Sequence, residues 1–193
     1  MRLRLVLVGL LCMSASARAD VEPGDVVFQR SRSRQAQVIA EVTRSEWTHV
    51  GVVLERRGER VVLEAVSPVR WTPFETWRRR GVGGRVLVRR PRAPLDTDAL
   101  RRMSALGDAW VGRPYDARFE WGEARLYCSE LVFLLFERGA GVRLVEPQRW
   151  ADLSLGPRAR RLARQRLGRL PDPDGLLVTP AALATSDALR TIE

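Results

Sequence analysis

The stretch "LYCSELVFLLFERG", residues 126–139, places Cys128 at the start of an apolar run. The Leu, Val and Phe residues that follow predict a buried helix from Ser129 to Arg138, closed by Gly139. The N-terminus of a helix carries partial positive charge and free N–H groups, and both favour a thiolate over a thiol. Cys128 is therefore either a nucleophile or a small core residue, because free cysteine is among the most buried residue types.

The sequence contains a single histidine, His49, which bears on the role of Cys128. A cysteine hydrolase needs a histidine that pairs with the thiol and protonates the leaving group. The second cysteine of the sequence, Cys12, lies in an N-terminal apolar segment. Cys128 and His49 are thus the candidate nucleophile and base. The alternative for His49 is a strand residue whose ring bonds a backbone carbonyl.

A β-hairpin is predicted for residues 47–68, "WTHVGVVLERRGERVVLEAVSP", because two runs rich in Val and Leu flank a polar tip at 56–59. If the hairpin closes through a two-residue loop, Gly51 lies opposite Glu64. Side chains alternate along a strand, so His49 and Glu64 then share one face of the sheet. A partly buried acid needs a partner, which makes Glu64 a candidate to orient His49. The alternative is a solvent-facing acid.

Turn signals recur at short intervals and divide the rest of the chain into further elements. The expected elements are strands at 26–29 and 84–90 and helices within 33–46 and 96–112. Strands therefore cluster early in the chain, with helices on either side. This order predicts an α+β fold with an antiparallel sheet.

Five short motifs together resemble one known family. They are "PGDVVF" at 23–28, "THVGVV" at 48–53, "VLEA" at 62–65, "PYDARFEW" at 114–121 and "YCSELV" at 127–132. In this order they resemble the YiiX-like branch of the NlpC-type, papain-like cysteine hydrolases, in which the histidine precedes the cysteine. The resemblance covers about 23–139, and "LLVTPAALATSDAL" at 176–189 is similar to the family's tail.

This resemblance implies a circularly permuted papain-like core in which an antiparallel sheet packs against helices. Cys128 is then the nucleophile at a helix N-terminus, and the sheet carries His49 and Glu64. Tyr127 and Ser129, on either side of the thiol, are candidates for the oxyanion site, where backbone N–H groups would bind the developing charge. Packing is the alternative role for Tyr127.

Two tryptophans are candidates to line the substrate groove. Trp47 leads into His49, and Trp121 leads into Cys128. Buried packing is the alternative for both. We expect neither a cofactor nor a metal, because one histidine and one cysteine do not make a typical zinc site.

The N-terminal segment "MRLRLVLVGLLCMSASARA", residues 1–19, has the three parts of a secretory signal peptide. Arginines begin it, an apolar run follows, and small residues at 17 and 19 mark a cleavage site. We therefore expect an exported, periplasmic or secreted protein in which Cys12 leaves with the signal. The mature chain, 20–193, is long enough for one domain.

The expected function is hydrolysis of an amide or related acyl bond by Cys128, His49 and Glu64 through an acyl-enzyme. The substrate would be a cell-wall peptide, a small amide or a lipid-like molecule. One alternative is a lipid acyltransferase or acyl hydrolase similar to the lecithin retinol acyltransferase-like group. Another is a protein of the same fold that binds cell-wall peptide or lipid without turnover.

The segment Arg158–Arg169, "RARRLARQRLGR", is densely basic. All 33 basic residues of the chain are arginines, which indicates a compositional bias and not selection for a basic surface. The formal charge of +10 is therefore weak evidence for a nucleic-acid partner, and we expect none. For an exported protein, contact with an anionic membrane or envelope surface is the better functional interpretation. The alternative is a solvated amphipathic helix with Leu162 and Leu167 turned inward.

Overall fold

Six antiparallel strands form the central sheet in the computed structural model, which describes residues 21–192. The predicted signal peptide, 1–19, lies outside the described residues. The strand order is β4-β3-β2-β1-β5-β8, and each neighbouring pair is antiparallel. The strands are β1 (Val26–Gln29), β2 (His49–Arg56), β3 (Glu59–Glu64), β4 (Arg70–Pro73), β5 (Leu87–Pro91) and β8 (Leu189–Ile192).

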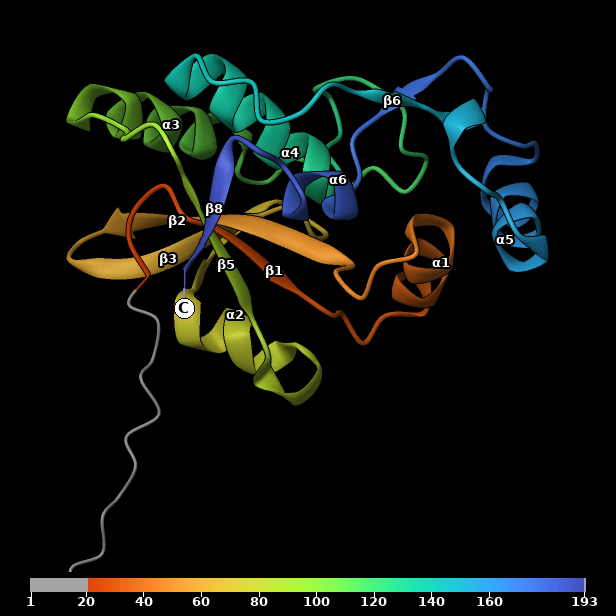
Figure 1. The fold of residues 1–193 in the computed structure, drawn as a ribbon, viewed down its shortest axis with the longest axis horizontal. Helices are drawn as coiled ribbons and strands as arrows, with labels where there is room; N and C mark the ends of the chain where they lie inside the picture. Colours follow the sequence, from red (N-terminus) through yellow and green to blue (C-terminus); the bar gives the residue numbers. More distant parts are fainter. Residues whose placement is uncertain (1–20, 193) are drawn as a thin grey trace, which may run out of the picture.

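Helices lie on both faces of this sheet, which confirms the expected α+β class with an antiparallel sheet (Figure 1). In the figure, α3, α4 and α6 cover one face and α2 lies beneath the other, while α1 and α5 stand beyond one end. The helices are α1 (Arg34–Thr43), α2 (Phe74–Arg80), α3 (Thr97–Trp110), α4 (Cys128–Leu135), α5 (Pro157–Leu167) and α6 (Pro180–Ala184). Within the described residues, no helix is long and apolar enough to cross a membrane.

The hairpin of β2 and β3 has the predicted register. Arg56 pairs with Glu59, and Val52 pairs with Leu63. The two loop residues, at 57 and 58, have φ angles of 53° and 79°, as a tight two-residue hairpin turn requires. By alternation, His49 and Glu64 lie on the same face of the sheet.

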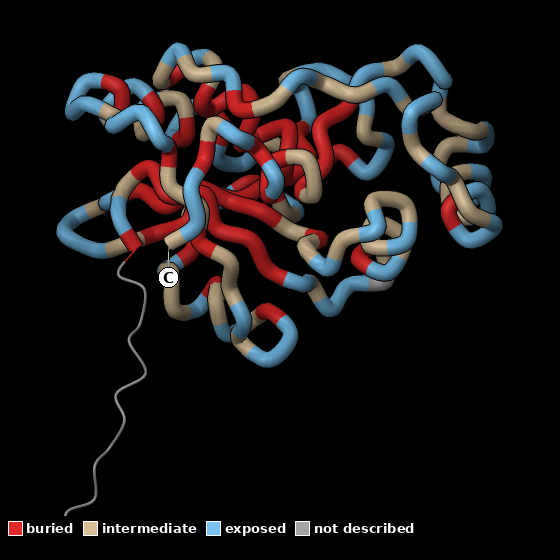
Figure 2. The backbone as a smooth tube through the Cα atoms, viewed as in Figure 1, coloured by how far each residue is buried: buried red, intermediate tan, exposed pale blue. Residues whose placement is uncertain are grey.

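Alternate residues of the hairpin pack into two separate hydrophobic clusters. Val50, Val52 and Leu54 belong to a large cluster that includes α4 and part of α3. Val53 and Val62 belong to a smaller cluster around Trp77 of α2. Figure 2 shows the buried backbone concentrated in the sheet and in the helix above it. Each strand of the hairpin is therefore buried on both faces, which holds its register firmly.

All eight residues of α4 are buried, and the helix continues into a π-helical turn at Phe136–Ala140. It starts at Cys128, one residue earlier than predicted. The prediction that Gly139 closes the helix is wrong, because Gly141, with φ of 68°, occupies the C-cap. A Cβ on Gly139 would lie 2.5 Å from Met103 Cγ of α3. Glycine is needed there for close helix packing and not for termination.

Several short elements complete the described chain. The helix predicted within 33–46 is α1, and the one predicted within 96–112 is α3, whose cap Asp96 accepts the N–H of Ala99 at 2.6 Å. The strands β6 (Gln148–Arg149) and β7 (Leu176–Leu177) form a separate pair. Two 3₁₀ turns, η1 (Val82–Gly84) and η3 (Trp150–Asp152), are the remaining short elements.

Candidate active site

The structure brings Cys128, His49 and Glu64 together. The side chain of Cys128, which is 2% exposed, lies beside the His49 ring and raises its pKa. His49 Nε2 lies 2.7 Å from Glu64 Oε2. Because Nε2 is held by the carboxylate, Nδ1 is the ring nitrogen that remains for the thiol. This is the order that a nucleophile, a base and an orienting acid require.

The fold explains why residues so far apart in sequence meet. His49 is the first residue of β2, so its ring stands at the end of the sheet. There it reaches Cys128, although α4 packs on the opposite face from Glu64. Gly51 follows on the face of His49, and a Cβ there would lie 2.4 Å from Val62 Cγ1. Glycine at this position lets the hairpin strands carry both site residues at close range.

Glu64 is fully buried and held by several donors. Thr72 Oγ1 donates to Glu64 Oε1 at 2.7 Å, and Arg80 of α2 donates to Oε2 in a short charged hydrogen bond. Arg70 Nε lies 3.5 Å from Oε1. Burial alone would raise the carboxyl pKa, but His49 first and Arg80 second outweigh it and lower the pKa of Glu64 to about 2. Glu64 is therefore ionised throughout the physiological range.

His49 is held in its charged form. Burial lowers the pKa of the ring, but the hydrogen bonds and charges of Cys128 and Glu64 outweigh burial and raise the pKa to about 9. Trp77 of α2 stacks on the ring, with centroids 6.1 Å apart and planes at 28°. A protonated ring at neutral pH has a proton to give to a leaving group.

Tyr127 and Ser129 both bind the backbone of Val178 near the C-terminal end. The Tyr127 hydroxyl accepts the N–H of Val178 at 3.1 Å, and the Ser129 hydroxyl donates to its carbonyl at 2.8 Å. Both side chains are buried. These contacts fix the start of α4 on either side of Cys128.

Glu130 closes the turn that leads into the helix. Its carboxylate accepts the backbone N–H of Gly122 at 2.9 Å and that of Tyr127 at 3.4 Å. The side chain is fully buried, and burial raises the pKa of Glu130 to about 8 despite these two donors. Glu130, two residues after Cys128, therefore keeps its proton to a higher pH than an ordinary carboxyl group.

The two tryptophans proposed for the groove lie elsewhere. Trp121 is 42% exposed and packs edge-on against Phe133, with ring centroids 5.5 Å apart. Trp47 lies in a shallow pocket with Ser45, under the guanidinium of Arg85. Neither belongs to the lining of the cavity beside Cys128.

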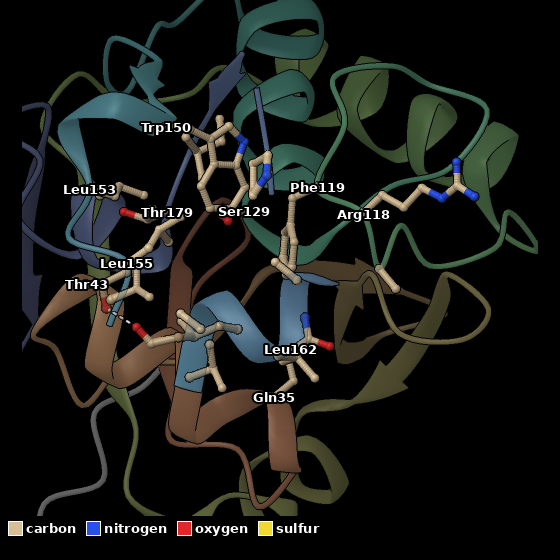
Figure 3. Close-up of a pocket in the computed structure, with 18 of the residues that line it drawn as sticks. Gln35, Thr43, Arg118, Phe119, Ser129, Trp150, Leu153, Leu155, Leu162 and Thr179 are labelled. Carbon is tan, nitrogen blue, oxygen red and sulfur yellow. Dashed lines mark hydrogen bonds between the residues drawn. The ribbon is translucent and has the colours of Figure 1, made fainter. Parts of the chain in front are cut away.

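A narrow apolar cavity opens beside Cys128 between α1 and α5 (Figure 3). Leu162 of α5 lies on one side, and the rings of Phe119 and Trp150 stand opposite it. Ile39 of α1 also belongs to the lining. Its open volume of about 90 Å³ suits a slender apolar group. Apolar cavities of this kind bind hydrocarbon groups by removing them from water.

Two further residues at the site had no role assigned from the sequence. Tyr115, within the quoted motif "PYDARFEW", accepts a hydrogen bond from Gln35 Nε2 at 3.1 Å, which leaves the Tyr115 proton for another acceptor. Burial and the nearby Cys128 raise the pKa of Tyr115 well above its usual range, so it remains a donor. Arg80 is the other, and nothing in "FETWRRR" distinguishes it from the neighbouring arginines.

Comparison with known proteins agrees with this arrangement. A family model described as "Permuted papain-like amidase enzyme, YaeF/YiiX, C92 family" matches residues 20–193. The "Uncharacterized protein YiiX" of Escherichia coli (strain K12) is 30% identical over 193 residues, which is 100% of this chain and 96% of that protein. The crystal structure of "metalloprotein yiiX" from Escherichia coli O157:H7 superposes with a TM-score of 0.84 at 31% identity, covering 89% of this chain and 96% of that one.

These matches run over nearly the whole chain and confirm the resemblance first drawn from five short motifs. In this chain, as the word permuted implies, the strand with the histidine comes before the helix with the cysteine. The chain belongs to the YaeF/YiiX family of permuted papain-like amidases.

Proposed function

We propose that this protein is an exported cysteine hydrolase that cleaves amide bonds through an acyl-enzyme. The observation that carries the proposal is the convergence of Cys128, the His49 ring and Glu64, with His49 Nε2 lying 2.7 Å from Glu64 Oε2. Membership of an amidase family supports the reaction class. The signal-like segment 1–19 supports export, to the periplasm or beyond.

In the first half of the proposed reaction, Cys128 Sγ attacks the carbonyl carbon of the substrate and forms a carbon–sulfur bond. The carbon–nitrogen bond then breaks as His49 gives its proton to the departing amine. Backbone N–H groups at the start of α4 have no partner within the helix, so they can bind the oxyanion. The hydroxyl of Tyr115 can donate to the same charge.

In the second half, water attacks the thioester while His49 takes its proton. The carbon–sulfur bond breaks, the acid leaves, and Cys128 recovers its original state. Glu64 keeps the imidazolium oriented and stabilised in both halves. The raised pKa of His49 and the lowered pKa of Glu64 fit these two roles.

The apolar cavity favours a substrate whose acyl part is hydrocarbon. It adjoins the thiol itself, and most of the residues that α1 and α5 contribute to its lining are apolar. An acyl amide or lipid acyl group therefore fits better than the polar peptide of a cell wall. This keeps a lipid acyl hydrolase, similar to the lecithin retinol acyltransferase-like group, as the second candidate.

A solved relative is described as a metalloprotein, so the donor set of this chain bears on the mechanism. Within residues 21–192 there is no group of three or more His, Cys, Asp or Glu side chains that could hold a metal ion. The described residues therefore do not fit a protein-held metal. We route no step of the proposed reaction through one.

Helix α5 supports a partner of a second kind, the anionic surface of a membrane or envelope. Leu162 and Leu167 face the apolar cavity, whereas Arg160, Arg161 and Arg164 line the outer side. A basic helix with one apolar side is typical of contact with an anionic lipid surface. Such contact would bring a lipid-like substrate to the cavity.

The test of the proposed function is capture of the acyl-enzyme. The protein is mixed with a p-nitrophenyl hexanoate ester and quenched in acid, and mass spectrometry then locates the added acyl group. We expect one hexanoyl group on Cys128, slower acylation in His49→Gln and none in Cys128→Ala. An unmodified Cys128 in the folded protein, alkylated only after unfolding, would instead support a binding protein without turnover.

A further inference from the structure

A second cavity lies on the other side of the candidate catalytic residues. His49 lines it, together with Thr48, Tyr115 and the arginines Arg32 and Arg80. Its open volume is about 410 Å³, larger than that of the apolar cavity. Gln35 and Ile39 contribute to the walls of both, so the two spaces are neighbours.

The lining of this second cavity is cationic. Among its described lining residues, Arg32 and Arg80 are charged at neutral pH and no carboxylate faces it. Arg80 binds Glu64 through Nη2, but a guanidinium carries five N–H donors and so retains others. Arg32 is exposed, and its Nη2 makes a long contact of 3.5 Å with the Gly81 carbonyl.

A buried amide in the same wall supplies the second observation. Gln29 is 1% exposed and lines the cavity, yet its Oε1 and Nε2 have no hydrogen-bond partner among the described residues. A Cβ on Gly81 would lie 2.4 Å from Gln29 Oε1, so glycine leaves room for this amide. Buried polar groups are normally paired, and an unpaired amide beside a cavity suits a polar ligand.

The chemistry decides which part of the substrate belongs on which side. His49 gives its proton to the departing nitrogen, so the amine part must lie on the His49 side. The apolar cavity adjoins Cys128 and not His49, which places the acyl part there. The acyl part of the substrate therefore belongs in the apolar cavity and the amine part in the second cavity, with the scissile bond between them.

Resting on the proposed amidase function, we propose that the second cavity is the leaving-group subsite and selects an amine that carries an anionic group, either a carboxylate or a phosphate. Arg32 and Arg80 provide the charge, and Gln29 provides a donor and an acceptor within the pocket. Guanidinium groups bind both carboxylates and phosphates through paired N–H donors. Substrates of the N-acyl amino acid class meet these requirements.

The test uses four amides that share a hexanoyl group and differ in the amine released. Glycine carries a carboxylate, phosphoethanolamine a phosphate, ethanolamine no charge and ethylenediamine a positive charge. We expect kcat/KM for one or both anionic amides to exceed that for the ethanolamide by at least about tenfold, mainly through KM. The first two arms show which anion is preferred.

Arg32→Gln should remove most of that preference, lowering kcat/KM for the anionic amides far more than for the neutral ethanolamide. Arg30→Gln is the matched control, because it removes the same charge two residues away and does not line the cavity. Equal hydrolysis of all four amides by the wild type would overturn the subsite. So would an equal loss on every substrate in Arg32→Gln.

Binding separates failure of the subsite from failure of the proposed function. In Cys128→Ala, N-hexanoylglycine should bind at least about tenfold more tightly than the ethanolamide, and Arg32→Gln in that background should remove most of the difference. Gln29→Leu should also weaken binding of N-hexanoylglycine. The free protein should be no less stable, because the substitution removes a buried side-chain amide that has no hydrogen-bond partner among the described residues. Equal binding of both amides would contradict the proposed subsite, whether or not the wild type hydrolyses them.

Discussion

At the scale of single residues, Glu64 has the most unusual surroundings of the site. Its side chain is fully buried, yet His49, Thr72 and Arg80 give its two oxygens hydrogen-bond donors. Two of those partners are cationic, so the carboxylate remains charged in the interior. Together with Cys128, the charge of Glu64 in turn raises the pKa of the neighbouring imidazole.

Replacing Glu64 with Gln tests this dependence. The substitution retains the size of the side chain but removes its charge, so the pKa of His49 should fall from about 9. Because the chain has a single histidine, an NMR titration reads the ring directly. Glu59→Gln, at the exposed hairpin tip, serves as the control and should leave the titration unchanged. If Glu64→Gln and the control titrate alike, another group orients the ring.

At the scale of elements, the hairpin could be predicted and helix α2 could not. The two-residue turn at Arg57 and Gly58 determines the register of β2 and β3. Because the loop has an even number of residues, Glu64 lies on the same face of the sheet as His49. Arg80 reaches Glu64 because α2 crosses beneath the sheet at a particular angle. Tertiary packing sets that angle, so the three consecutive arginines at 78–80 do not by themselves indicate which one contacts Glu64.

The start and end of α4 show the same division between local and tertiary causes. The apolar run predicted a buried helix behind Cys128, and burial of all eight residues confirms it. Its end could not be predicted, because Gly139 serves the contact with Met103 of α3, which is distant in sequence. The groove residues were missed for a related reason: Phe119 and Trp150 come from separate loops that only the fold brings together.

Helix α5 carries the second prediction, which concerns vesicle binding. Each arginine near an anionic surface contributes about 1 kcal/mol, so replacing three with Gln should weaken binding to phosphatidylglycerol vesicles by roughly 100-fold. The variant changes Arg160, Arg161 and Arg164 together, and co-sedimentation measures the bound fraction. A control variant removes the same charge elsewhere, through Gln at Arg57, Arg92 and Arg101. If both triple variants bind equally, general charge attracts the vesicles and α5 has no special role.

At the scale of the whole molecule, two buried acids give opposite dependences of stability on pH. The pKa of Glu64 is lowered to about 2, so its contribution to stability is present above pH 4.5 and is lost as pH falls towards 2. The pKa of Glu130 is raised to about 8, so its effect runs the other way. Between pH 4.5 and 8 the native state retains a proton on Glu130 that the unfolded chain has released, and stability falls as pH rises.

Glu130→Gln isolates that second contribution. Glutamine matches the protonated acid in size and lack of charge and does not titrate; its single carbonyl oxygen can keep the 2.9 Å bond from Gly122 but not also the 3.4 Å bond from Tyr127. Urea unfolding should show a smaller decline in stability between pH 4.5 and 8 for the variant, which should be the more stable protein at pH 8. Glu120→Gln, which changes an exposed acid in the segment before α4, should follow the wild type. Parallel profiles for wild type and Glu130→Gln would mean that Glu130 is ionised in the native state.

The anchoring of Tyr127 and Ser129 to Val178 has a consequence for timing. Cys128, His49 and Glu64 are all synthesised before the segment that fixes the start of α4. A nascent chain that ends before Val178 therefore has all three side chains but lacks the two contacts that position the helix start. On the proposed mechanism, the reactivity of Cys128 requires this later segment to have docked.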